Sequence, residues 1–305
     1  MAMFTQRPLF YGEDGKHLAR GPVLGILVGI LPAIFWGILP LWLQKVGRGT
    51  FRSQLLGTTI GIVFVAAAIH VICSYQISTS NWILFALSGF CWSFGQAGQY
   101  YCYTHLGVSV TMPLSTALQI IGNSMIGGLF FGEWKGTRDI AISLVALIII
   151  VAGVYLTNGK GTASPNAKPR DYAILVLSTV GYWLYSAFPL MASVDSKIQG
   201  FLPQSLGMLM SAFLIGFLRY KEIVDGATVR NISSGLIFAV AASTYLIAMS
   251  MIGMVNAFVL SQLNVLVSTL SGAIVLKEAT GKGRVAYLAV GLVVLITGAV
   301  LMVVV

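Results

Sequence analysis

Ten apolar stretches run along this chain of 305 residues, and each is close to the roughly 20 residues that a helix needs to cross a bilayer. They lie near residues 22–44, 53–75, 82–104, 108–131, 138–156, 172–192, 203–218, 231–251, 255–276 and 285–305. Charged residues make up only 9% of the chain, against about 25% in an ordinary soluble domain. The sequence therefore predicts an all-α polytopic membrane protein with ten transmembrane helices.

The longest polar break divides these stretches into two groups of five. Across the break, residues recur in the same order: Gly89, Gly107, Ser115 and Glu133 have counterparts in Gly235, Gly253, Ser261 and Glu278. Because each group has an odd number of helices, the second has the opposite polarity, as in the inverted repeats of secondary transporters. We predict a polar N-terminal tail at 1–21, a first five-helix repeat at 22–157, a basic loop at 158–171 and a second five-helix repeat at 172–305.

Basic residues gather in alternate loops. The loops after the odd-numbered stretches hold 12 of the 18 Lys and Arg residues, and the tail and remaining loops hold 6. Because cytoplasmic loops are rich in Lys and Arg, we expect the odd-numbered loops in the cytoplasm and both termini outside the cytoplasmic membrane. The net charge of +9 then reflects topology and not binding to nucleic acid.

Uncharged polar and aromatic residues recur at helical spacing, whereas no Asp, Glu, Lys or Arg lies well within any stretch. The absence of charge argues against an ion pathway or a substrate of fixed charge. Candidate binding residues are Trp36 in the first stretch, Trp92, Gln96 and Gln99 in the third, Ser115, Gln119 and Asn123 in the fourth, Tyr182 in the sixth and Asn264 in the ninth. Bonding between neighbouring helices is the alternative role for the Ser, Gln and Asn residues.

Neutral faces of this kind fit a sugar. An amide group offers two donors and an acceptor to the hydroxyls, and an aromatic ring can cover the C–H face of the sugar. The sequence lacks the HExxH, GxSxG and Walker motifs, and Cys73, Cys91 and Cys102 do not have the spacing of metal ligands. We therefore expect a transporter with no catalytic residue, no cofactor other than coupled protons, and no metal.

Several longer segments carry a resemblance. Residues 92–99 read WSFGQAGQ, and LGVS at 106–109, TMPLST at 111–116, Gln119 and GEW at 132–134 follow. Further segments are FWG at 35–37, LSTVGY at 177–182, LSQL at 260–263 and VSTL at 267–270. They resemble bacterial glucose and ribose uptake proteins of the glucose/ribose porter family, within the drug/metabolite transporter superfamily. The resemblance covers nearly all of the chain after residue 22.

The resemblance implies a ten-helix carrier of the drug/metabolite transporter fold, with two inverted five-helix halves, a central cavity, alternating access and proton symport. It implies that the cavity is lined by Trp36, Gln96, Gln99, Ser115, Gln119 and Gln262. The chain departs from the family pattern at three places: Gly98 stands where relatives tend to have Asn, FAV at 238–240 where they tend to have a Trp-Gly pair, and Lys277 where Gly usually precedes the glutamate.

These observations predict import of a neutral monosaccharide such as glucose or ribose across the cytoplasmic membrane. Glu133 and Glu278 are the candidates for proton coupling, and facilitated diffusion is the alternative to symport. Two other functions stay open. An exporter or exchanger of amino acids or other metabolites could hold a zwitterion through helix ends and amides, and a scaffold subunit would carry no solute. The oligomeric state is not predicted.

Overall fold

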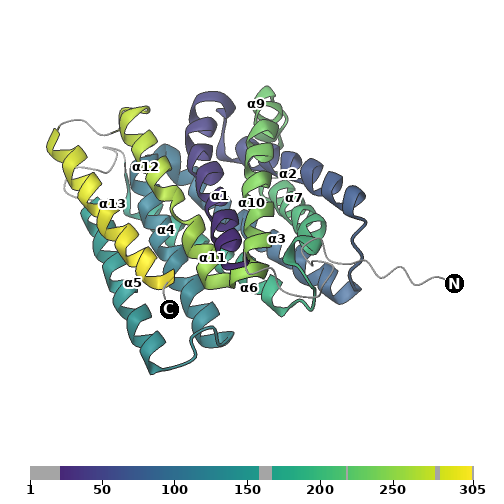
Figure 1. The fold of residues 1–305 in the computed structure, drawn as a ribbon. Coiled ribbons are helices and arrows are strands. Elements are labelled where there is room, and N and C mark those ends of the chain that lie inside the picture. The colour runs from purple at the N-terminus through teal and green to yellow at the C-terminus, as the bar shows by residue number, and fades with distance from the viewer. Residues whose placement is uncertain (1–20, 158–166, 218, 279–281, 304–305) are drawn as a thin grey trace.

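The computed structural model describes residues 21–157, 167–217, 219–278 and 282–303, and within these ranges its regular elements are helices, with no strand (Figure 1). The first half contains α1 (Gly21–Trp42), α2 (Phe51–Cys73), α3 (Thr79–His105), α4 (Val108–Met125) and α5 (Thr137–Thr157). The second contains α6 (Pro169–Met191), α7 (Phe201–Phe217), α8 (Tyr220–Ile223), α9 (Gly226–Arg230), α10 (Ile232–Ile252), α11 (Met254–Ser261), α12 (Asn264–Ile274) and α13 (Lys282–Val303). Nearly all of the tail predicted at 1–21 and much of the loop predicted at 158–171 lie outside the described residues.

Short turns of other helix types extend three of the helices. A π-helical turn, η1 (Leu43–Gly47), follows α1, and a second, η2 (Ile126–Phe130), follows α4. A 3-10 turn, η3 (Lys197–Gly200), leads directly into α7. With these turns included, each of the ten predicted stretches is helical over most of its described residues, and the ninth is interrupted at Gln262 and Leu263.

Eight helical segments in the described part of the chain are long and apolar enough to cross a membrane. Helices α3 and α4 are also long enough to cross a membrane, but their mean hydropathy is lower than that of these eight segments. These are the helices that carry most of the predicted amides, and each Gln or Asn lowers the mean hydropathy of its helix. The least apolar helices are therefore the ones in which the sequence places the binding residues.

The start of α6 lies three residues before the predicted boundary at residue 172. Pro169 occupies the first turn, where a helix tolerates proline because the N–H groups there have no partner within the helix. The backbone N–H of Lys168 donates to the Asp171 carboxylate at 2.9 Å and closes this turn. The basic loop is therefore shorter than predicted, since its last residues already belong to the helix.

Glycines let helices from the two halves approach closely. Gly61 of α2 faces Gly235 of α10, and a methyl group at either position would clash with the opposing backbone. Gly89 of α3 and Gly207 of α7 meet the backbone of each other's helix in the same way. Small residues at helix crossings are typical of membrane proteins, where close van der Waals packing drives association. The second and third helices of each half thus pack against those of the other half.

Helices α5 and α13 lie side by side at one edge of the molecule, with α12 and α4 next to them (Figure 1). Gly153 of α5 contacts Leu295, and Gly291 and Gly298 of α13 contact the backbone of α5. The outer faces of this pair carry exposed aliphatic and aromatic side chains, as expected of a surface in contact with lipid. The pair stands outside the group of helices that surrounds the cavity described below.

Candidate functional site

A cavity lies between helices from both halves of the described chain. It is lined by Trp36 and Leu39 of α1, Trp92, Gln96, Gln99 and Tyr103 of α3, Met112, Thr116 and Gln119 of α4, Tyr182, Tyr185 and Ser186 of α6, Phe238 of α10, Phe258 of α11, Gln262, and Asn264 of α12. All of these residues except Trp36 are buried. The cavity has a volume of about 50 Å³, enough for about four water molecules. A six-carbon sugar needs more space, so the helices must separate to admit one.

One wall of the cavity is a continuous network of amides and hydroxyls. The Tyr182 hydroxyl lies 2.8 Å from Gln99 Oε1 and 2.9 Å from Gln96 Oε1, and its single proton serves one of them at a time. Gln96 Nε2 donates to Gln99 Oε1 at 3.2 Å. Ser115 Oγ then accepts from both Gln99 Nε2, at 3.0 Å, and Gln119 Nε2, at 2.9 Å. The network joins α3, α4 and α6 and fixes the orientation of all three amides.

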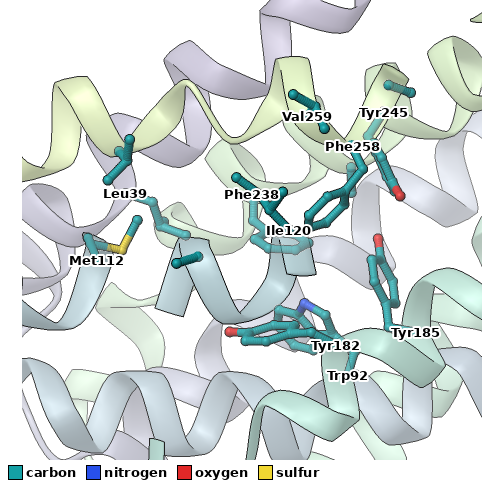
Figure 2. Packing of buried hydrophobic residues seen from close by; sticks show 14 of the residues in the cluster. Leu39, Trp92, Met112, Ile120, Tyr182, Tyr185, Phe238, Tyr245, Phe258 and Val259 are labelled. Carbon is teal, nitrogen blue, oxygen red and sulfur yellow. The ribbon is translucent and has the colours of Figure 1, made fainter. Parts of the chain in front are cut away.

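A second part of the cavity lining, the aromatic wall, consists of aromatic rings. The Phe238 ring lies 4.8 Å from the Trp92 ring and 5.5 Å from the Trp36 ring, measured between centroids. Tyr245 extends the cluster, with centroids 5.7 Å from Trp36 and 6.2 Å from Phe258. Figure 2 shows Trp92, Phe238 and Phe258 converging on the same region. These rings give the cavity an apolar surface in addition to its amides and hydroxyls.

Four polar atoms of the lining residues have no hydrogen-bond partner among the described residues. They are Nε1 of Trp36, Oγ1 of Thr116, the hydroxyl oxygen of Tyr185 and Oδ1 of Asn264. A buried polar atom without a partner costs about 1–3 kcal/mol, and native structures rarely leave one unexplained. The four atoms comprise a donor, an acceptor and two hydroxyls that can do either, so the cavity suits a neutral molecule with several hydroxyls.

Most of the predicted binding residues meet at this cavity. The residues that line it are Trp36, Trp92, Gln96, Gln99, Gln119, Tyr182, Gln262 and Asn264. Ser115 lies behind the lining and supports Gln99 and Gln119 through its hydroxyl. Asn123 is not among the lining residues: it is fully buried farther along α4, one helical turn beyond Gln119. Binding of a substrate by any of these residues stays a prediction.

Several lining residues are not among the predicted binding residues. Tyr185 and Ser186 follow Tyr182 by one helical turn, so the helical period alone could have added them. Thr116 directly follows Ser115, but it faces the cavity where Ser115 does not. Phe238 drew attention only as a departure from the family pattern, and the structure places it at the centre of the aromatic wall.

The chain breaks its ninth predicted helix beside the cavity. Instead of one continuous helix, α11 ends at Ser261 and α12 begins at Asn264. The backbone N–H of Val265 donates to the Gln262 carbonyl at 3.1 Å, and that of Leu266 to the Leu263 carbonyl at 3.1 Å. These three-residue bonds replace the four-residue bonds of an α-helix, a local tightening that often marks a hinge.

The two glutamates predicted for proton coupling do not line the cavity. The Glu133 carboxylate accepts hydrogen bonds from the N–H groups of the first two residues of α11, at 3.2 and 2.9 Å. The Glu278 carboxylate accepts from the first two residues of α4, at 2.9 and 2.7 Å. Gly253 and Gly107 precede these helices with φ of +79° and +87°, a conformation that suits glycine. Proton coupling stays a prediction for both glutamates.

Comparisons with known proteins agree on one family. The family model for sugar transport protein matches residues 27–305. A sugar uptake protein of Lactiplantibacillus plantarum is 38% identical, over 90% of this chain and 97% of that one. A protein of Latilactobacillus sakei named for ribose uptake, RbsU, is 37% identical over 91% of this chain and 97% of its own. The glucose uptake protein GlcU of Bacillus subtilis is 35% identical over 91% of this chain and 97% of its own.

A solved crystal structure has the same fold. It superimposes with a TM-score of 0.64 at 17% sequence identity, covering 92% of this chain and 96% of that one. At this identity the likeness concerns the fold alone. The apolar helices and the sequence comparisons together give the coarse identity: the chain is a multi-pass membrane protein that belongs to the sugar transport protein family.

Proposed function

We propose that this chain imports a neutral monosaccharide, such as glucose or ribose, through the central cavity. The observation that carries the proposal is the composition of the cavity lining. The lining combines amides with aromatic rings, and four of its polar atoms have no hydrogen-bond partner among the described residues. The described lining includes no Asp, Glu, Lys or Arg. The names of the relatives, which refer to sugar, ribose and glucose uptake, support the same substrate class.

Each wall has its own part in recognition. The hydroxyls of Thr116 and Tyr185 and the Asn264 carbonyl oxygen would pair with sugar hydroxyls, because these atoms gain their missing bonds in doing so. Trp92 and Phe238 would cover the C–H face of the ring. Gln96 and Gln99 already bond each other, and they would exchange part of that network for bonds to the sugar.

The proposed cycle is alternating access between two inverted five-helix halves of a ten-helix carrier. The packing between the halves is reciprocal and supports this cycle. Helices α1 and α2 of the first half pack on α10 of the second, and helices α6 and α7 of the second half pack on α3 of the first. Because the cavity draws residues from both halves, a movement of one half against the other would open it first to one face and then to the other.

Location and coupling complete the proposal. We place the protein in the cytoplasmic membrane with both termini outside, because Lys and Arg gather in the loops predicted to be cytoplasmic.

Proton symport would proceed through Glu133 or Glu278, and facilitated diffusion is the alternative. Accumulation of sugar that collapses with an uncoupler would support symport, whereas equilibration without accumulation would establish facilitation.

Uptake of labelled glucose into proteoliposomes tests the function directly. Unlabelled ribose, rhamnose and a mixture of amino acids serve as competitors, with and without an imposed pH gradient, and empty liposomes serve as the control. Saturable uptake that a sugar blocks is the expected result. Exchange of amino acids without sugar flux would contradict the substrate and favour a metabolite exporter, and no saturable flux at all would favour a scaffold.

A further inference from the structure

Two antiparallel helical segments, α4 with η2 and α11 with α12, are tied to each other at both ends. Glu133 follows the end of the first segment and binds the start of the second, whereas Glu278 follows the end of the second and binds the start of the first. Because α4 alone has 18 residues, it is about 27 Å long at 1.5 Å per residue. The two carboxylates therefore lie at opposite ends of the segment pair, separated by about the thickness of a membrane core.

The middle of this helix pair forms part of the cavity wall. Thr116 and Gln119 come from α4, Phe258 comes from α11, and Gln262 lies at the break between α11 and α12. Helices α4 and α12 also contact each other directly. Separation of the segments at one end would therefore open the cavity toward that membrane face, while the tie at the other end kept the opposite face closed.

Two features make such one-sided opening possible. The first is the 3-10 turn beyond Gln262, which lets α11 move independently of α12. Glu133 binds the start of α11, and Glu278 follows the end of α12. The ties themselves are charge-assisted hydrogen bonds to backbone groups that have no other partner in the first turn of a helix. Such bonds are strong enough to hold a closed end, and they can be broken without unfolding the helix.

We propose that Glu133 and Glu278 are positioning residues of the transport cycle, each holding the cavity shut at one membrane face and releasing its helix when the cavity opens there. Both ties are formed in this structure, in agreement with a cavity too small for a hexose. The inference rests on the proposed function only for the nature of the cargo. The predicted orientation assigns Glu133 to the external face and Glu278 to the cytoplasmic face.

The test measures access to the cavity from each face. Thr116→Cys places a reporter in the lining of a protein in which Cys73, Cys91 and Cys102 are replaced by Ala. A membrane-impermeant maleimide is applied to intact cells, which expose the external face, and to inverted vesicles, which expose the cytoplasmic face. The rate of labelling needs no sugar, so failure of this test and failure of sugar uptake can be told apart.

We expect Glu133→Gln to raise labelling at one face and Glu278→Gln to raise it at the other, each about tenfold, as for the loss of one hydrogen bond to a charged group. The Asp variants keep the carboxylate and should restore slow labelling in part. Glu222→Gln is the matched control, because it removes an ion pair with Arg52, at 2.8 Å, outside the helix pair. It should leave both rates unchanged.

Three results would overturn the inference. Folded Gln variants that label at the parent rate from both faces, or that both gain access at the same face, would show that the ties do not control opening. If the Gln and Asp variants at both sites lose folded protein alike, the glutamates are helix caps with a purely structural role. Thermal unfolding of each detergent-purified variant distinguishes that outcome from a change of access.

Discussion

The Tyr182 hydroxyl lies 2.8 Å from the side-chain oxygen of Gln99, and this bond links α6 to α3 at the polar wall of the cavity. Removing the hydroxyl in Tyr182→Phe keeps the ring but releases the two glutamines. Loss of a hydrogen bond of about 1 kcal/mol should raise the KM for sugar about fivefold with little change in folded protein. Tyr155→Phe, on the exposed face of α5, is the control and should leave uptake unchanged. An unaltered KM in Tyr182→Phe would remove this bond from substrate binding.

Gln96 and Gln204 offer a comparison between a cavity amide and a packing amide. Gln96 lines the cavity, whereas Gln204 donates to Ser88 Oγ at 2.7 Å and joins α7 to α3 away from it. We expect Gln96→Ala to lower uptake much more than the amount of folded protein, and Gln204→Ala to lower the two together. Transport rates normalised to purified protein measure the difference. Equal losses in both variants would make Gln96 structural.

Thr116→Val tests whether the unpaired hydroxyl serves the substrate. Its Oγ1 has no partner among the described residues, so the similarly shaped valine removes an unmet hydrogen bond. The melting temperature of the empty protein should stay the same or rise, while sugar affinity should fall about fivefold. Thr59→Val is the control: Thr59 bonds the Leu56 carbonyl, so this variant should lose stability and keep its affinity. A Thr116→Val variant with full affinity would contradict the assignment.

Gly61→Ala tests the contact between the halves. The added methyl group would meet the Ile232 carbonyl and Gly235, both part of the backbone, which cannot yield as a flexible side chain can. A loss of about 1–3 kcal/mol in unfolding free energy is expected from overpacking of this kind. Gly283→Ala, where nothing lies within 4 Å of the new methyl group, should be neutral. Thermal unfolding in detergent compares the two, and equal stabilities would show that α2 and α10 can separate without cost.

The sequence was sufficient for features that depend on local spacing. Apolar length predicted where the helices lie, and the four-residue spacing of Ser115 and Gln119 and the three-residue spacing of Gln96 and Gln99 placed these side chains in one network. The same spacing failed at Asn123, because a helical face continues past the end of a cavity and the period does not say where the cavity stops.

Features that depend on distant partners could not be predicted. Nothing near Glu133 in the sequence points to the start of α11, and the backbone atoms that it binds lie 121 and 122 residues away. The break at Gln262 was equally hidden, because the surrounding residues include no proline or glycine to interrupt a helix. Both features arise from tertiary packing, which overrides the local preference for a continuous, independent helix.

The low hydropathy of α3 and α4 has a consequence for biosynthesis. Amides such as Gln96 and Gln119 raise the free energy of moving a single helix from the translocon into lipid. Helices α3 and α4 are joined by a very short link, so they would enter the bilayer together. They would be stable there only once their polar faces had packed against each other. The cell would then assemble the proposed sugar site during insertion and not after it. Substitutions that make these helices more apolar should accordingly improve the yield of inserted protein while they abolish transport. The same few side chains would then limit production and supply activity.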